Sequence, residues 1–456
     1  MTTKITEQNI SELANAGVNW QSVFTGDGST GLTAVAGRGY FIDTTSGTVT
    51  VTLPNDASSS VGDTIILRDY AGTFATNNVT LTSTAKVSGA DLDGTLSTND
   101  LVVTLVYVDS TKGWVTIENE AKAVGATDTV FISATGGTIS TSGDFKTHIF
   151  TGDGCFVVTQ APVGCAPGVD YLVVAGGGGS GTYNGGGGGA GGFRVANSIG
   201  LPAPTTSPLA SCCGITVTAT TYPITVGAGG AAAAAVGAGP PYIGGDGSNS
   251  IFSTITSSGG GGGANNSNDG RDGGSGGGQG GEGPICSVGG TGNTPPVSPP
   301  QGNDGGTGGV SPSGRASGGG GGAGAAGGSA RACNPADGGD GGIGSYVSDT
   351  FLGGCAPSYG TPGPVSLTRY FSGGGGGGVE SAPTIPGGLG SNGDGGAGGG
   401  GPGGPGPTAR GTGTAGTANT GGGAGGASRR DCIGSPGYGN GAAGGKGIVV
   451  LRYKFQ

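Results

Sequence analysis

Charge, histidine and long apolar runs are all scarce in this chain of 456 residues. Charged residues make up 10% of it, and no cluster of Lys and Arg could neutralise a row of phosphates, so nucleic acid is not an expected partner. No stretch approaches about 20 consecutive apolar residues, and we expect no membrane insertion. The N-terminus lacks the apolar core of a secretory signal. The net charge of −10 is expected to keep a charge-poor surface soluble.

Residue patterns for catalysis, metals and cofactors are equally sparse. His148 is the only histidine, it lies among strand-forming residues, and no C-x-x-C pair accompanies it. The turn Phe24-Thr-Gly-Asp-Gly28 recurs at 150–154, but each copy offers one carboxylate, and Asp91-Leu-Asp-Gly94 lacks the later ligands of a calcium loop. Gly-x-Gly-x-x-Gly matches reflect glycine abundance alone, without a Walker lysine. We therefore expect no catalytic residue, no metal, no cofactor and no enzymatic activity.

Eight cysteines suggest disulfides, although eight thiols allow 105 pairings and the sequence does not choose between them. Cys155 and Cys165 flank a short connection beside a strand-like arm, where a cross-hairpin disulfide is expected. Disulfides form in oxidising surroundings, yet no export signal is expected here. This combination fits a protein that is released by lysis, as a virus particle is. The candidates are Cys155, Cys165, Cys212, Cys213, Cys286, Cys333, Cys355 and Cys432.

The first third of the chain is predicted to form a short helix and then β-strands. Residues 5–17 fit a helix in which Ile10, Leu13 and Ala14 share one face, and this helix must pack on a partner chain or the next domain unless it is a frayed terminus. Residues 20–120 alternate apolar and polar residues between Gly, Asn and Asp turns, which predicts a small sandwich or β-prism with Trp114 in its core. The strands are expected at 47–53, 64–68, 78–82, 101–108 and 113–117.

Glycine dominates the rest, since 96 of the 116 glycines lie in the last 285 residues. The Gly-X-Y period is absent, which excludes collagen. Strand-like segments precede the glycine runs at 129–132, 146–150, 155–158 and 171–174, lie between them at 192–195, 222–226, 250–256 and 368–371, and follow them at 448–453. The runs occupy 176–179, 185–189, 259–263, 318–322, 373–378, 398–401 and 421–423.

These runs could form a flexible tether or a packed core. Their wide spread, the strands between them and the closing strand favour a core. Side by side in the polyproline-II geometry, glycine runs can satisfy one another's backbone groups, because glycine lets backbones approach closely. The predicted fold class is mainly β, with a β-sandwich or prism-like stalk domain and then a glycine-rich domain of packed polyglycine-II helices, short strands and loops. The predicted parts are an attachment helix (1–20), the stalk (21–125), a β lead-in (126–175) and the glycine-rich domain (176–456).

Loops between the runs are the predicted recognition elements, because a rigid scaffold with variable loops is typical of binding surfaces. Tyr offers contact area at low entropic cost, and Asn offers adaptable hydrogen bonds. For any single residue, a solvated turn remains the alternative. The candidates are Tyr183, Asn184, Tyr242, Asn265, Asn266, Asn268 and Tyr359.

The ordered series of motifs resembles the glycine-rich domain of phage tail fibres of the marine and cyanophage type. It includes Tyr171-Leu-Val-Val-Ala-Gly-Gly-Gly-Gly179, Gly187-Gly-Gly-Ala-Gly-Gly-Phe193, Thr225-Val-Gly-Ala-Gly-Gly230 and Gly444-Gly-Lys-Gly-Ile-Val-Val-Leu-Arg-Tyr453, and covers residues ~150–453. The first domain, with Val49-Thr-Val-Thr-Leu-Pro54, is similar to the stalk modules of cyanophage fibres. The eight cysteines depart from the family pattern.

The resemblance implies an extracellular virion appendage, usually a homotrimer, whose N-terminus joins a phage tail or baseplate protein. Its far tip would bind a host surface glycan or outer-membrane protein. The leading functional expectation is therefore a tail-fibre or receptor-binding protein. The alternative is a structural fibre or decoration protein whose glycine slab is a rigid spacer. A depolymerase would need paired carboxylates in a cleft, and no spacing indicates them.

Overall fold

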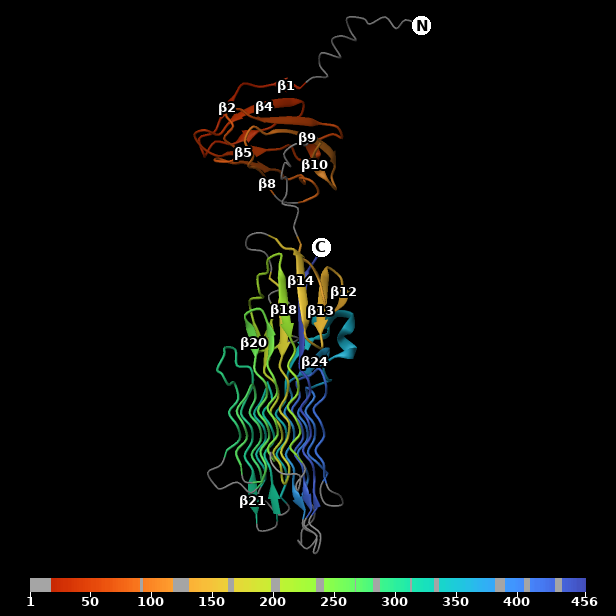
Figure 1. Cartoon of the computed structure of the whole chain (residues 1–456). Helices are drawn as coiled ribbons and strands as arrows, with labels where there is room; N and C mark the ends of the chain where they lie inside the picture. The colour runs from red at the N-terminus through yellow and green to blue at the C-terminus, as the bar shows by residue number, and fades with distance from the viewer. Residues whose placement is uncertain are drawn as a thin grey trace, which may run out of the picture. The chain divides into compact units, whose positions relative to one another are not determined.

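The computed structural model divides the chain into two units, residues 1–130 and 131–456 (Figure 1). The predicted helix at 5–17 lies outside the residues that the structure describes. No helix among the described residues is long and apolar enough to cross a bilayer. The described residues are 18–90, 93–117, 131–162, 168–197, 206–234, 242–266, 268–281, 288–311, 314–331, 336–381, 390–405, 411–430 and 437–456.

Unit 1 consists of two facing sheets with an apolar core between them. One sheet has the order β1-β4-β6-β9-β10, with β2 also paired to β4, and the other has the order β3-β5-β7-β8. The chain alternates between the sheets from β3 to β7, so β4 and β6 are parallel neighbours, as are β5 and β7. The bounds are β1 (Asn19–Trp20), β2 (Phe24–Thr25), β3 (Leu32–Thr33), β4 (Arg38–Asp43), β5 (Val49–Thr52), η1 (Asp56–Ser58), β6 (Thr64–Asp69), β7 (Val79–Thr82), β8 (Gly94–Leu96), β9 (Val102–Asp109) and β10 (Gly113–Thr116).

The period-two pattern of the sequence determines which side chains enter this core. In β5, Val49 and Val51 are buried while Thr50 and Thr52 are exposed. Trp114 is fully buried, and its Nε1 donates to the Pro54 carbonyl oxygen at 2.9 Å, so its predicted place in the core is confirmed. The indole thus satisfies its one polar group while it buries its rings.

The first copy of the repeated Phe-Thr-Gly-Asp-Gly segment forms a hydrogen-bonded turn, whereas the second is a bend at 151–153 that bonds to a distant segment. The Asp27 carboxylate accepts from the Ser29 and Thr30 backbone N–H groups, and these bonds with the Thr30 hydroxyl hold the pKa of Asp27 far below its usual value. The Asp153 carboxylate accepts from the Val226 N–H at 2.8 Å. Of the glycines in both copies, only Gly28 has a left-handed φ, 82°.

Unit 2 begins with two more sheets, β11-β14-β18-β19-β20 and β12-β13-β28-β15-β16-β17. The C-terminal strand β28 lies between β13 and β15, antiparallel to both, and apolar clusters cover both faces of its sheet. This double burial explains the unbroken apolar runs of β15 and β28. The bounds are β11 (Ser133–Thr135), β12 (Thr138–Ser142), β13 (Phe145–Phe150), β14 (Gly154–Gln160), β15 (Asp170–Val174), β16 (Phe193–Ala196), β17 (Ala210–Ser211), β18 (Thr221–Thr225), β19 (Ser250–Phe252), β20 (Ile255–Ser257) and β28 (Ile448–Lys454).

Two predicted strands differ in detail. The segment at 129–132 is not a strand where it is described, and β11 begins only at Ser133. The segment at 250–256 is a hairpin of two short strands, because Ser253 adopts a left-handed φ of 53° between them. The sequence also did not predict α2 (Asp349–Leu352) and η2 (Gly353–Ser358), which lie between the paired strands β23 (Ser345–Ser348) and β24 (Thr368–Phe371).

His148 is a buried residue of β13, as predicted. Its Nδ1 lies 2.7 Å from the Gly136 carbonyl oxygen, and its Nε2 lies 3.0 Å from the Tyr453 hydroxyl. Burial lowers the pKa of His148 and raises that of Tyr453 to about 12. Both rings therefore remain neutral near pH 7 and contribute packing and hydrogen bonds to the core.

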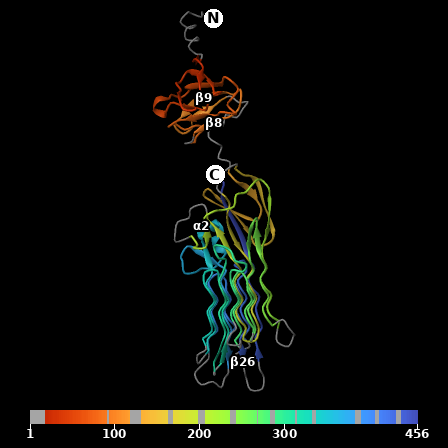
Figure 2. The ribbon, with the colours of Figure 1, turned by 90° about the vertical axis from the view of Figure 1, so that its left-hand side faces the viewer.

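The glycine runs continue from these sheets as extended segments that lie side by side, as two perpendicular views show (Figures 1 and 2). The central run, 185–192, hydrogen-bonds to different neighbours at successive positions with a period of three. Gly186 and Gly189 donate to one neighbour (258–264), Gly187 and Ala190 to a second (317–322), and Gly188 and Gly191 to a third (421–427). This is the bonding expected of a threefold polyglycine helix.

The carbonyl groups of the same run face three further neighbours with the same period. They accept from Ala175 and Gly178, from Ser275 and Gly278, and from Gly375 and Gly378. The central run is therefore surrounded by six others, which bond all eight of its N–H groups and seven of its eight carbonyl groups. The prediction of packed polyglycine-II helices is confirmed.

At the edges of this slab, carboxylates replace the missing neighbours. An Asp side-chain oxygen accepts from a backbone N–H of the adjacent run in each case, at distances of 2.6–3.0 Å. Six of the 28 acidic residues thus complete the backbone network, a role that the composition alone did not indicate. The residues are Asp246, Asp269, Asp272, Asp304, Asp337 and Asp340.

Close backbone packing makes a specific prediction about methyl groups. A Cβ at Gly188 would overlap the carbonyl group of Gly178, whereas a Cβ at Gly152 would meet only the flexible end of Lys446, 3.6 Å away. We expect Gly188→Ala to lower the free energy of unfolding of unit 2 by about 3 kcal/mol or more, the upper range for overpacking. Gly152→Ala should change it by less than about 0.5 kcal/mol. Denaturant unfolding of the two variants measures this difference, and equal midpoints would contradict the packing.

Candidate functional site

Unit 2 has two chemically different ends. The sheet end contains β13, β14 and β18, and the loop end contains β21 (Gly309–Ser311), β22 (Gly314–Ala316), β25 (Glu380–Ser381), β26 (Arg429–Arg430) and β27 (Gly437–Tyr438) (Figures 1 and 2). The glycine runs connect the two ends repeatedly. Successive connections therefore alternate between them, and residues far apart in the sequence meet at each end.

Six of the seven predicted recognition residues meet at the loop end. The Asn266 N–H donates to the Tyr183 carbonyl oxygen at 3.1 Å, and the Thr182 N–H donates to that of Tyr242 at 3.1 Å. Asn265 and Asn268 are joined by their backbones and by a short hydrogen bond between their side-chain amides. The three connections that contain Tyr183, Tyr242 and Asn265 thus form one patch at the loop end.

Tyr359 does not belong to this patch. It follows η2 at the sheet end and packs beside the apolar cluster that contains Phe351 and Leu352. The sequence alone could not place Tyr359 at the sheet end. The end at which a loop lies depends on the direction of the run before it, and that direction follows only from the order of all the runs.

A tight turn at residues 182–184 reverses the chain between two glycine runs. Tyr183 and Asn184 have left-handed φ values of 60° and 51°, which cost little for Asn and more for Tyr. The Ser317 hydroxyl donates to the Asn184 carbonyl oxygen at 2.6 Å, and the Gly281 N–H donates to the same oxygen at 3.1 Å. These bonds from two other runs hold the turn.

The Asn184 side chain is fully buried, so it is not available to a ligand on the surface. That Asn184 contacts a receptor stays a prediction. Its amide has no hydrogen-bond partner among the described residues, which costs roughly 1–3 kcal/mol. Asn suits position 184 because its backbone adopts the left-handed conformation of this turn at low cost.

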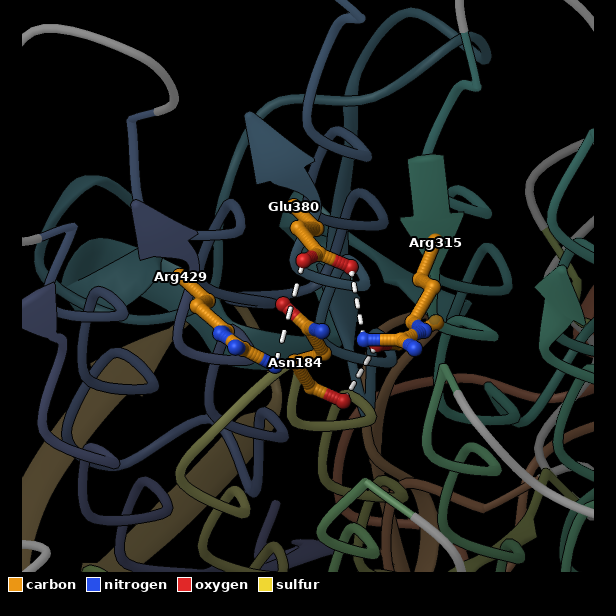
Figure 3. A network of polar contacts seen from close by, with 5 residues as sticks. Asn184, Arg315, Glu380 and Arg429 are labelled. Carbon is orange, nitrogen blue, oxygen red and sulfur yellow. Dashed lines mark hydrogen bonds and ion pairs between the residues drawn. The ribbon is translucent and has the colours of Figure 1, made fainter. Parts of the chain in front are cut away.

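A polar network that the sequence did not indicate lies beside this turn (Figure 3). Glu380 lies 3.2 Å from Arg315 and 3.8 Å from Arg429, and the Glu380 side chain is 7% exposed. Glu380 and Arg429 stand opposite each other in the parallel pair β25–β26, and the Arg429 guanidinium lies 4.7 Å from the centre of the Tyr183 ring. The network therefore fixes Tyr183 against a second connection of the loop end.

The structure contains no disulfide among the described cysteines. Cys155, Cys212, Cys213 and Cys355 are free thiols, and the other four lie outside the described residues. Cys155 therefore does not form the expected bridge to Cys165, and Cys165 itself is one of the four cysteines outside the described residues. The slab is held by its backbone hydrogen bonds.

The buried network predicts a clear effect of removing its charge. In Glu380→Gln, Arg315 and Arg429 lose the carboxylate between them, and truncating one partner of a buried ion pair costs about 3–5 kcal/mol. Because Arg315 is 35% exposed, we expect the lower end of this range. The exposed pair Arg271–Asp246 offers a control, and Arg271→Gln should cost less than about 1 kcal/mol. Thermal unfolding distinguishes the two, and equal effects would contradict the buried role of Glu380.

Comparisons with known proteins agree with this architecture. No curated protein matches the chain. The model of the family described as "Glycine-rich domain" matches residues 151–454, which include the lead-in strands from β14 onward, all the glycine runs and β28. The chain therefore belongs to the glycine-rich domain family.

Proposed function

We propose that this protein is a phage tail-fibre or receptor-binding protein that attaches a virion to its host through the loop end of unit 2. The observation that carries the proposal is the gathering of Tyr183, Tyr242 and the 265–268 turn at one end of a hydrogen-bonded slab. A rigid scaffold that presents loops from many connections suits surface recognition. The resemblance of the motif series to phage tail fibres supports the same function.

The side chains available at the loop end fit a polar ligand. Asn268 is exposed, while Tyr183, Tyr242, Asn265 and Asn266 are half-buried. Half-buried tyrosines offer flat surfaces on which sugar rings can stack, and asparagine amides donate to and accept from hydroxyl groups. A host surface glycan is therefore the favoured ligand, with an outer-membrane protein as the second possibility.

In this proposal unit 1 belongs to the particle side. The N-terminal part of a homotrimeric fibre would join a tail or baseplate protein, and the mature protein would be extracellular as part of the virion. The resemblance of unit 1 to stalk modules supports this division of labour.

A structural fibre or decoration protein is the second candidate. The burial of Asn184 and the pairing of Glu380 with two arginines favour it, because these side chains are enclosed or paired within the loop end and offer nothing to a ligand. The slab would then act as a spacer.

Exchange of the 265–268 turn tests the first candidate. Purified full-length protein with a fluorescent label should bind a subset of bacterial strains. Replacing Asn265, Asn266 and Asn268 by serine should reduce or redirect binding, because these side chains lie on the proposed contact surface. Cell labelling measured by flow cytometry gives the result.

Ser358→Ala is the matched control, since Ser358 is exposed at the sheet end. It should leave cell labelling unchanged. If the serine variant binds the same strains as strongly as the parent, recognition does not use this surface, and the spacer becomes the better account.

A further inference from the structure

Cys212 and Cys213 form an exposed pair of neighbouring thiols in unit 2. Their Sγ atoms lie 3.3 Å apart, within hydrogen-bond distance of each other, and both thiols are free. The pair follows β17 in the sheet that contains β13, so it belongs to the sheet end and takes no part in the proposed recognition surface. The sequence marked both residues as disulfide candidates without choosing a partner for either.

The backbone is anchored on both sides of the pair. β17 ends at Ser211 and pairs in parallel with β16. Beyond the pair, Ile215 and Val169 exchange two backbone hydrogen bonds of 2.8 and 2.9 Å. The Ser211 hydroxyl also accepts from the Cys213 N–H at 3.4 Å. Residues 212–214 are therefore a short connection between two fixed points, and the two sulfurs are held close together.

The two thiols are not equivalent. The hydrogen bond to Cys212 and the negative charge of the Cys212 thiolate raise the pKa of Cys213. Cys213 therefore keeps its proton and donates it towards the Cys212 sulfur. The thiolate is the nucleophile in thiol–disulfide exchange. Cys212 is thus suited to attack first, with Cys213 as the second thiol.

A disulfide between these neighbours is feasible and strained. The sulfurs have to approach from 3.3 Å to about 2.05 Å, a movement that two exposed side chains make by rotation. Consecutive Cα atoms are about 3.8 Å apart, whereas disulfides usually join Cα atoms about 4.4–6.8 Å apart. Strain makes a disulfide easier to reduce, and strained or exposed disulfides are the labile ones. Such a bond suits reversible chemistry better than it suits a permanent staple.

We propose that Cys212 and Cys213 are a redox-active dithiol that reacts with small-molecule disulfides. The Cys212 thiolate attacks one sulfur of the small disulfide, so that a mixed disulfide forms and one small thiolate leaves. Cys213 then loses its proton, its sulfur attacks the Cys212 sulfur, and the second small thiolate leaves. The protein gives up two electrons and two protons, and the small disulfide becomes two thiols. The proposal does not rest on the function of the loop end.

The state of the pair follows its surroundings. Glutathione keeps thiols reduced inside most cells, whereas oxidising surroundings favour disulfides. The pair is therefore open inside a cell and closes outside it, where the closed ring stiffens the connection at 212–214.

Oxidised glutathione tests the proposal on full-length protein. The protein is reduced, freed of reductant and treated with oxidised glutathione, and the remaining thiols are blocked with iodoacetamide. The peptide that contains both cysteines is then weighed by mass spectrometry. It should carry neither glutathione nor the blocking group, and it should be two hydrogens lighter than the reduced peptide. In samples stopped early, the transient glutathione should be on Cys212, and dithiothreitol should restore both thiols.

Single substitutions separate closure from ordinary thiol modification. Cys212→Ser and Cys213→Ser each leave one thiol of the pair, so glutathione should remain on the peptide as a stable adduct. Cys155→Ser is the matched control, because it removes an exposed thiol in β14 of the other sheet and should leave closure at the parental rate.

Three results overturn the proposal. The first is a parent peptide that keeps glutathione as stably as the single variants do, or that stays reduced. The second is a transient adduct on Cys213, which contradicts the assignment of the attacking thiol. The third is loss of closure in Cys155→Ser, because the electrons would then pass through another thiol.

Discussion

The hydrogen bonds between the backbones of neighbouring glycine runs are the interaction on which unit 2 depends. A polyglycine-II helix has no internal hydrogen bonds, so every N–H and C=O of a buried run must find a partner in another run. The run 185–192 meets this requirement with six neighbours. Glycine is required because a Cβ at nearly any position of that run would occupy the place of a neighbour's carbonyl group.

The remaining parts of unit 2 follow from this constraint. Ordering glycine is entropically expensive, and the sheets reduce that cost because runs such as 175–181 and 185–192 continue directly from β15 and into β16. The strand pairing thereby sets which runs lie together. At the slab edges, where no further run is present, Asp side chains accept the leftover N–H groups. At the loop end, beyond the packed runs, the ion pairs of Glu380 with Arg315 and Arg429 join neighbouring connections.

The sequence predicted what local patterns determine. Strands such as β5, β9 and β28, the buried places of Trp114 and His148, and the packed glycine core were all predicted, because alternation and composition report burial directly. It did not predict that β4 and β6 are parallel, since parallel and antiparallel strands share one alternation. Glu380, Arg315 and Arg429 were missed because their positions, 65 and 49 residues apart, come together only through the order of the runs. The sequence also could not show that Asn268 is exposed and Asn184 is buried, because both are asparagines in connections between glycine runs.

Amide hydrogen exchange of the central run tests the account most directly. The N–H groups of Gly186 to Gly191 all donate to neighbouring runs, whereas Gly28 lies in an exposed turn of unit 1. We predict that the amides of 186–191 exchange only through unfolding of the whole slab, far more slowly than that of Gly28. Exchange of these six amides at random-coil rates would contradict the packed slab and return the glycine runs to a flexible tether.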